Sequence, residues 1–176
     1  METEAFEQAV REHQRMVFSM ALNALRNRAL AEEIAQDVFL ALLEHGGRIE
    51  SAAHLVYWLR RVTARRCIDQ MRRQRFRRWL PLRDVHAAAS PAAGAPGRDP
   101  LLSQRLARLI AALPAATRVA LVLRYQEDLE PADIGRVLGI PENAVRKKLR
   151  HALTSLKLRL TPPRPSDVAE AHLEQQ

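Results

Sequence analysis

The sequence predicts an all-α protein of two small helical domains joined by a flexible linker. Apolar residues recur at the three- and four-residue spacing of amphipathic helices through most of the 176 residues. Only 5% of the residues are aromatic, whereas Ala, Leu and Arg are frequent, and this composition favours helices over strands. A stretch rich in Pro, Gly and Ala interrupts the pattern between Trp79 and Pro100, which is unusual inside one compact domain. We therefore expect domains at 1–78 and 101–160, a linker at 79–100 and a tail at 161–176 that is a candidate for disorder.

Three helices are expected in the first domain. The first ends before Asn27, and the second runs from about Leu30 until the two glycines that follow His45 end it. The third begins near Ser51 and leaves its polar faces to arginine. Trp58 lies at helical spacing with other apolar residues, so a core position is favoured over a platform for stacked bases, but both interpretations remain open. The apolar positions that define the three helices are Phe6, Val10, Val17, Ala21 and Leu25, then Leu30, Ile34, Ala35, Val38, Phe39, Leu42 and Leu43, then Leu55, Leu59, Val62, Ile68 and Met71.

Four helices are expected in the second domain. Asp99 precedes Pro100, which is the order of an N-cap and a proline at the first helical position. Pro114 starts the next helix, a short helix covers Pro131–Leu138, and the last spans roughly Glu142–Leu160. The inward positions are predicted to be Leu102, Leu106, Leu109 and Leu113, then Val119, Val122 and Leu123, then Val145, Leu149, Ala152, Leu156 and Leu160.

Positive charge is concentrated in two segments. The formal net charge is +8 and the sequence pI about 10.8, which indicates a polyanionic partner. Acids outnumber bases before Glu50, whereas the segment Tyr57–Arg78 carries many arginines against the single acid Asp69. The segment Glu142–Arg159 is also basic. A surface that served only solubility would mix the two signs, so we expect both segments to bind DNA.

Several classes of protein are not expected. Cys67 is the only cysteine and is predicted to be a small buried apolar residue. The six histidines are scattered, and neither a phosphate-binding glycine loop nor a nucleophile arrangement is present, so we expect no enzyme, no metal and no cofactor. The acidic N-terminus does not resemble a signal peptide, and the longest apolar stretch, Leu109–Leu123, is too short and too interrupted to span a bilayer. We expect a cytoplasmic protein without membrane insertion.

The segment Glu130–Arg150 has the pattern of a helix-turn-helix. Gly135 supplies a small residue where two helices cross, and Gly139 supplies a residue that tolerates positive φ in the turn. An ordinary helical hairpin with a solvated charged face is the alternative. The side chains expected to project toward a DNA major groove are Asn143, Arg146, Lys147 and Arg150.

The order of these segments resembles bacterial RNA polymerase sigma factors of the extracytoplasmic-function group. The run Glu32–Leu40, followed by Trp58–Val62, Ile68-Asp69 and Arg72-Arg73, resembles region 2 of that family. The second domain resembles region 4, and a linker replaces region 3. The region 4 positions are Leu113-Pro114, Arg118, Leu121–Tyr125, Leu129, Ile134-Gly135, Leu138–Pro141, Val145, Leu149 and Ala152.

The resemblance implies a role for each segment. Gln36, Asp37 and Phe39 would dock on the β′ clamp helices of core polymerase, although Phe39 is alternatively a core residue. The helix beginning at Glu142 would read the −35 element through Arg146, Lys147 and Arg150. Partners implied are core polymerase (β′ clamp helices and β flap), promoter DNA and an anti-sigma factor. The −10 element and DNA melting would fall to Arg61, Arg65, Arg66, Arg72 and Arg73, with Asp69 either contacting DNA or pairing with Arg65, Arg66 or Arg73.

The chain also departs from the family pattern. The recognition helix opens Asn143-Ala144-Val145-Arg146-Lys147-Lys148, in place of the Gly-Thr-Val-Lys-Ser-Arg type. The loop Glu44–His54 lacks the usual aromatic and basic residues, which affects −10 specificity. One alternative function is a helix-turn-helix regulator that is not a polymerase subunit. The segment of Gln36, Asp37 and Phe39 argues against it, because a simple repressor needs no such surface. The other alternative is a helical adaptor for acidic proteins.

Overall fold

The computed structural model describes residues 3–77 and 99–161, and these residues form helices and turns without any strand. The predicted all-α fold class is therefore confirmed. The predicted linker and tail lie almost entirely outside the described residues. The elements are α1 (Thr3–Leu25), α2 (Arg28–His45), the short 3-10 turn η1 (Gly46–Arg48), α3 (Ala52–Arg77), α4 (Pro100–Ala111), α5 (Ala115–Tyr125), α6 (Pro131–Leu138) and α7 (Glu142–Leu160).

Side-chain caps determine where several of these helices begin. Arg26 has a left-handed backbone (φ 57°) that ends α1, and Asn27 Oδ1 then accepts a hydrogen bond of 3.0 Å from Leu30 N. As a result α2 begins at Arg28, two residues earlier than expected. Asp99 Oδ1 accepts from Leu101 N at 2.9 Å, which confirms the predicted cap of α4.

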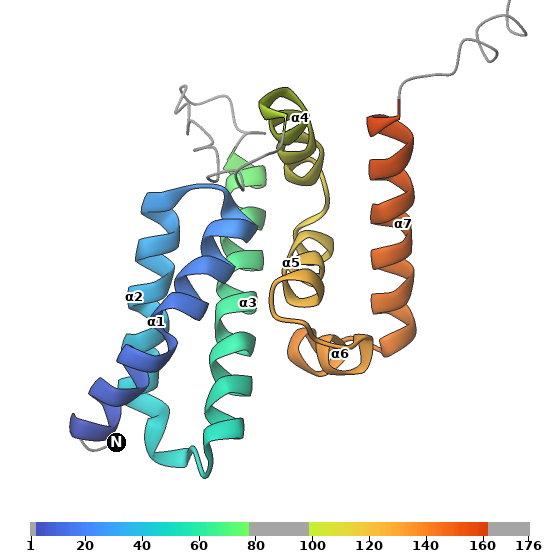
Figure 1. Ribbon diagram of the computed structural model, residues 1–176. Helices are drawn as coiled ribbons and strands as arrows, with labels where there is room; N and C mark the ends of the chain where they lie inside the picture. The colour runs from blue at the N-terminus through green and yellow to red at the C-terminus, as the bar shows by residue number, and fades with distance from the viewer. Residues whose placement is uncertain (1–2, 78–98, 162–176) are drawn as a thin grey trace, which may run out of the picture.

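Helices α1, α2 and α3 form one bundle, shown in blue to green in Figure 1. Its core includes Met20, Val38, Leu42 and Leu59, each at most 2% exposed. The hydroxyl of the buried Thr63 donates to Leu59 O at 2.7 Å, which satisfies it within its own helix. Packing within this bundle determines which faces of α2 and α3 remain exposed.

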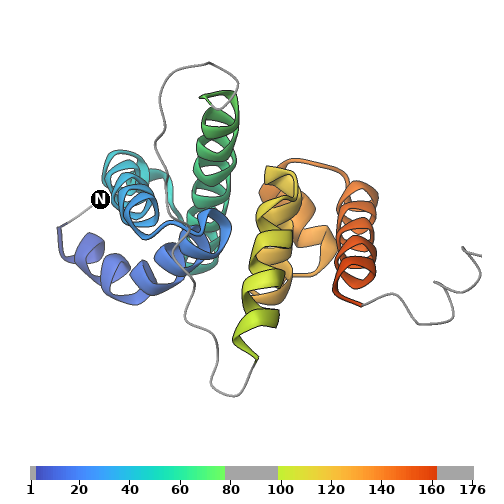
Figure 2. The ribbon, with the colours of Figure 1, turned by 90° about the horizontal axis from the view of Figure 1, so that it is seen from above.

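Helices α4 to α7 form a second group, with α7 as its outermost member in Figure 2. Leu123, Ile134 and Val145 are fully buried and join α5, α6 and α7. Helix α4 differs from the prediction, because none of its described side chains is fully buried and Leu102, expected to face inward, is 48% exposed. Helix α4 contacts α7 and leaves much of its apolar face accessible.

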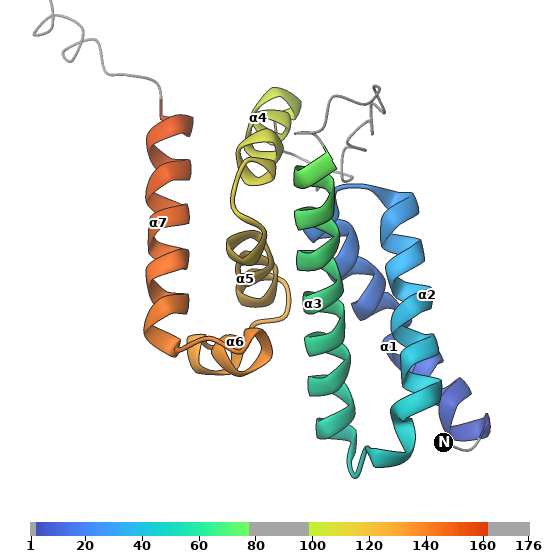
Figure 3. The ribbon, with the colours of Figure 1, turned by 180° about the vertical axis from the view of Figure 1, so that it is seen from behind.

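The two groups pack directly against each other. Helix α3 contacts both α5 and α6, and Figure 3 shows it beside them from behind. Helix α1 also contacts α5. The sequence pattern predicts two domains and a linker but contains no signal for this contact between them.

Candidate nucleic-acid interface

Helices α6 and α7 cross steeply (Figure 1), and two glycines lie in α6 and at its end. A Cβ added to Gly135 would lie 2.8 Å from Ile140 O, so the backbone after the turn occupies the space that a side chain would need. Gly139 ends α6 in the left-handed conformation, with φ 67°. Both glycines therefore have the roles predicted from sequence, and they set the angle at which α7 leaves the turn.

The outer face of α7 carries a continuous polar stripe. Val145, Leu149, Ala152 and Leu156 are buried against the neighbouring helices, which turns the opposite side of α7 to solvent. All four side chains predicted to contact DNA from this helix are exposed, at a spacing of three and four residues that aligns them. They are Asn143, Arg146, Lys147 and Arg150.

Glu142 holds one of these side chains in place. Its Oε1 accepts from Arg146 Nε at 2.8 Å and lies 2.6 Å from Arg146 Nη2. Two donors on one carboxylate restrict the rotation of the guanidinium more than a single bond would. Arg146 is thus held at the first turn of α7, on the exposed side.

The predicted arginines of α3 lie on two different faces. Arg61, Arg65 and Arg72 are exposed to solvent, as is Arg73. Arg66 turns toward α2, where its Nη1 lies 2.7 Å from Asp37 Oδ2, and both side chains stay partly exposed. This pair joins a residue predicted to bind DNA to one predicted to bind polymerase.

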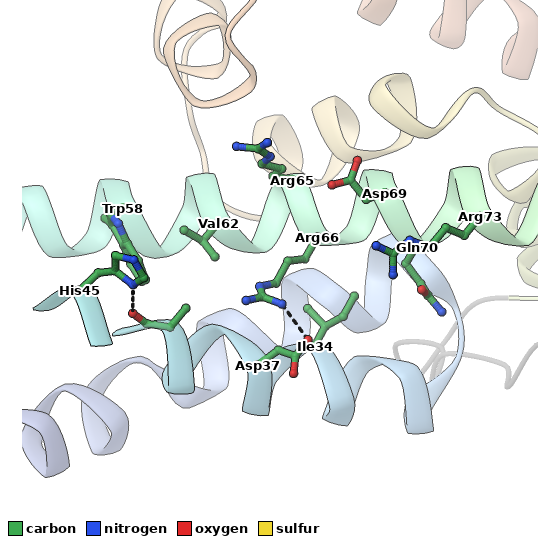
Figure 4. A pocket seen from close by; sticks show the side chains of 11 residues that line it. Ile34, Asp37, His45, Trp58, Val62, Arg65, Arg66, Asp69, Gln70 and Arg73 are labelled. Atoms are coloured by element: carbon green, nitrogen blue, oxygen red, sulfur yellow. Dashed lines mark hydrogen bonds and ion pairs between the residues drawn. The ribbon is translucent and has the colours of Figure 1, made fainter. Parts of the chain in front are cut away.

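A cavity of about 460 Å³ lies between α2 and α3. Figure 4 shows Arg66 pointing across it to Asp37, with Trp58 and His45 at one end. Trp58 is partly buried and packs against the core, so it is neither a fully buried core residue nor a free platform. The carboxylate of Asp69 points away from Asp37 in Figure 4 and forms no ion pair among the described residues, so the predicted pairing with a neighbouring arginine is not seen.

The exposed face of α2 differs in part from the prediction. Gln36 is exposed and Asp37 is partly exposed, as a docking surface requires. Phe39 is only 9% exposed and belongs to the core, so it is not available to a partner. Leu40 and Leu43 are 59% and 47% exposed and continue the stripe of Gln36 and Asp37 by one and two helical turns. The sequence predicts Leu43 to lie beside the core. This prediction is wrong, because α2 carries apolar residues on more than one face and the spacing of apolar residues does not show which face is buried.

The burial of two charged groups of the second domain, one side chain largely enclosed and one partly buried, was not identified from sequence. Glu127 follows α5, and its side chain is 8% exposed. Arg118 donates to Ala24 O at 3.1 Å from Nη1, and its Nη2 bonds Ala111 O. Burial lowers the pKa of Arg118, and the nearby charge of Arg26 lowers it further. The sequence contains one signal for Arg118, a charged residue within an apolar helix. It does not identify the acceptor Ala24 O, because that residue lies 94 positions away in the sequence.

The described residues carry neither a membrane-spanning helix nor a cluster of metal ligands. None of the helices in residues 3–77 and 99–161 is long and apolar enough to cross a membrane. Within the same residues no three His, Cys, Asp or Glu side chains are grouped in a way that could hold a metal ion.

Comparison with known proteins matches both helical groups to one family. Residues 9–77 match the family model "Sigma-70 region 2" and residues 103–156 match "Sigma-70, region 4". The RNA polymerase sigma factor CarQ of Myxococcus xanthus is 32% identical over 163 residues, covering 88% of this chain and 92% of that protein. The ECF RNA polymerase sigma factor SigF of Caulobacter vibrioides is 31% identical over 130 residues, covering 73% of this chain and 70% of that protein. Among solved structures, the sigma factor RpoE of Bartonella quintana in complex with the anti-sigma factor NepR aligns with a TM-score of 0.71 at 19% identity, covering 92% of this chain and 100% of that chain.

Proposed function

Because the chain belongs to the sigma-70 family of RNA polymerase sigma factors, in the extracytoplasmic-function group, we propose that three of its helices divide the contacts of transcription initiation. A sigma factor binds core RNA polymerase and recognises promoter DNA, so the chain needs a polymerase surface and DNA surfaces. The exposed faces of α2, α3 and α7 supply them. The domain limits 1–78 and 101–160 are part of the proposal, and the family matches at 9–77 and 103–156 support them.

Helix α7 reads the −35 element in the major groove. The single observation that carries this assignment is the stripe of four exposed polar side chains on the outer side of the second helix of a helix-turn-helix. Arginine is the side chain best suited to a guanine edge, and Glu142 holds Arg146 on the exposed side of the first turn. Asn143, Lys147 and Arg150 complete the contact with bases and phosphates.

Helix α3 binds the −10 element and keeps the DNA open. The positions involved are Arg61, Arg65, Arg66, Arg72 and Arg73, and the exposed arginines among them neutralise phosphates. Melting follows from differential binding: a surface that holds the separated strand more tightly than the duplex shifts the equilibrium toward the open form. Asp69 contacts DNA in this scheme, since it has no ion-pair partner among the described residues.

Helix α2 docks on the β′ clamp helices of polymerase. Gln36 and Asp37 provide polar contacts, and Leu40 and Leu43 provide the apolar contact that sequence had assigned to Phe39. The second domain would bind the β flap, as the family resemblance implies. An apolar pair with a polar rim is the composition expected of a protein-binding surface.

The chain acts in the cytoplasm, where polymerase and promoter DNA are found, and it has no catalytic chemistry of its own. An anti-sigma factor binds it, a partner suggested by the similar fold of RpoE in its complex with the anti-sigma factor NepR. A helix-turn-helix regulator that is no polymerase subunit is disfavoured, because it leaves the region 2 match at 9–77 without a role.

Run-off transcription with core polymerase tests the proposal. The native chain should produce a transcript from a cognate promoter fragment, selected from random DNA by the holoenzyme. Asp37→Arg should reduce polymerase binding at least tenfold, whereas Glu12→Arg on the exposed side of α1 should not. Failure of the native chain to produce any promoter-specific transcript, or unchanged polymerase affinity for Asp37→Arg, would count against the assigned roles.

A further inference from the structure

The acid in the first turn of α7 is bound to an arginine of the same helix. A carboxylate at this position commonly serves the dipole of the helix, and α7 begins after Pro141 without any side-chain cap. Oε1 of Glu142 nevertheless accepts from Arg146 Nε at 2.8 Å and lies 2.6 Å from Arg146 Nη2. The side chains of Glu142 and Arg146 are 42% and 62% exposed, so DNA that reaches the start of α7 meets both of them.

The ion pair uses one edge of the Arg146 guanidinium and leaves another edge free. Glu142 takes the edge formed by Nε and Nη2. Because a guanidinium carries its donors in a rigid planar fork, both N–H groups of Nη1 and the second N–H of Nη2 remain available at its end. Parallel donors of this kind match O6 and N7 of guanine. The carboxylate therefore determines which edge of Arg146 a base can meet.

Glu142 also changes the net charge that Arg146 brings to DNA. In the part of the chain that the structure describes, Arg146 pairs with an acid, whereas no ion pair involves Lys147 or Arg150. A cation whose charge is compensated gains less from a phosphate than an uncompensated one. Lys147 and Arg150 are thus suited to phosphates, which hold any DNA alike, and Arg146 is suited to a base edge.

We propose that Glu142 is a positioning residue that sets the base specificity of α7 by acting through Arg146. This inference rests on the proposed function. On a guanine, the held guanidinium makes both hydrogen bonds. On another base it cannot turn to a phosphate, because Glu142 keeps its Nε–Nη2 edge and repels the phosphate. Unmatched donors are then left without partners in the groove, which weakens binding to the wrong sequence.

Holoenzyme binding to a set of DNA fragments tests this role. The fragments derive from the promoter that the holoenzyme selects, and each base pair of the upstream element is replaced in turn. Arg146→Ala identifies the base pair that Arg146 reads, as the position where discrimination is lost. Glu142→Gln should reduce discrimination at that base pair by about threefold or more. The same variant should bind unrelated DNA about twofold more tightly or better, with a salt slope steeper by up to about 0.9.

A double-mutant cycle separates action through Arg146 from direct contact with DNA. In the Arg146→Ala background, Glu142→Gln should cause no further change in discrimination at the identified base pair. Glu7→Gln is the matched control, because it breaks a pair of the same spacing with Arg11 on α1. This control should leave both discrimination and affinity for unrelated DNA unchanged.

Three results would overturn the inference. They are unchanged discrimination in Glu142→Gln, an equal loss at every base pair of the element, and a full effect of Glu142→Gln in the Arg146→Ala background. The equal loss would mean that Glu142 only stabilises the start of α7. Undiminished discrimination in Arg146→Ala at every base pair would remove the proposed base contact of Arg146 and this inference with it. Loss in Arg146→Ala without loss in Glu142→Gln would remove the inference alone.

Discussion

At the scale of single residues, the backbone of the helix-turn-helix depends on two glycines for different reasons. Gly135 has no room for a side chain, since Ile140 O lies 2.8 Å from where its Cβ would be. Gly139 has open space around it and is required for its backbone angle, φ 67°, which costs other residues about 1–2 kcal/mol. Sequence spacing identified both positions, because each glycine lies where a steep helix crossing or a turn needs one.

Cys67 should be unreactive in the folded protein. Burial raises the pKa of its thiol from 9.0 to about 12, so the thiolate is negligible at pH 8. Ellman's reagent should react at pH 8 at least a hundredfold more slowly with the native chain than with the chain in guanidinium. The raised pKa also means that the contribution of the protonated Cys67 thiol to stability is complete below pH 9 and is lost as the pH rises toward 12. Rapid labelling under native conditions would show that α3 opens locally around this residue.

At the scale of elements, α2 and α3 each present two faces with different tasks. Helix α2 buries Ile34, Val38 and Leu42 and exposes Gln36 and Leu40 on the opposite side. Helix α3 directs Arg66 to α2, Arg60 to Glu127 and Arg65 to solvent. Charge counting treats these three arginines as equivalent, whereas the packing of the neighbouring helices gives each a separate environment.

The exposed leucines of α2 provide a test of this division. Leu40→Asp with Leu43→Asp should weaken binding to core polymerase at least tenfold, because the docking surface loses its apolar contact. The melting temperature should change by only a few degrees, since both side chains are largely exposed in the free chain. The matched control is Leu101→Asp with Leu158→Asp, which changes two exposed leucines outside α2. This control should leave the polymerase contact made by α2 unchanged. Equal polymerase affinity of the α2 variant and the native chain would remove α2 from the interface.

At the scale of the whole molecule, the proposed function makes the exposed faces of α3 and α7 two parts of one bivalent DNA-binding protein. Each domain gains effective concentration from the other once one is bound, without any new contact. The affinity for promoter DNA should therefore depend on both α3 and α7. The change of that affinity with salt concentration should also depend on both helices.

The salt dependence of promoter binding tests whether both domains contact DNA. Each phosphate contact contributes about 0.9 to the slope of log affinity against log salt concentration. Arg146→Ala with Lys147→Ala should reduce the slope for holoenzyme–promoter binding by up to about 1.8, and Arg65→Ala with Arg72→Ala should do the same. The quadruple variant should lose about the sum, while Arg11→Ala with Arg15→Ala, two exposed arginines of α1, should leave the slope unchanged. A slope that responds to only one of the two pairs would mean that only one domain contacts DNA.

The sequence alone determined the features that depend on local chemistry. Helical periodicity, Asp99 before Pro100, and Gly135 and Gly139 at the turn specify the helices and the helix-turn-helix, because each acts over a few neighbouring residues. The order of motifs predicted the family that the comparisons show. Even the early start of α2 at Arg28 has a local cause, the Asn27 cap, which the pattern of apolar residues does not report.

Only the tertiary structure decided which faces are available. Phe39 and Leu40 are adjacent and both apolar, yet one is buried and the other exposed, because the bundle covers only one side of α2. Arg60 and Glu127 lie 67 positions apart, and no periodicity links them. Long-range contacts are set by the packing of whole helices and not by neighbours in sequence. For this reason the sequence predicts two separate DNA-binding domains, and the structure adds that they dock on each other through a residue of the basic segment itself.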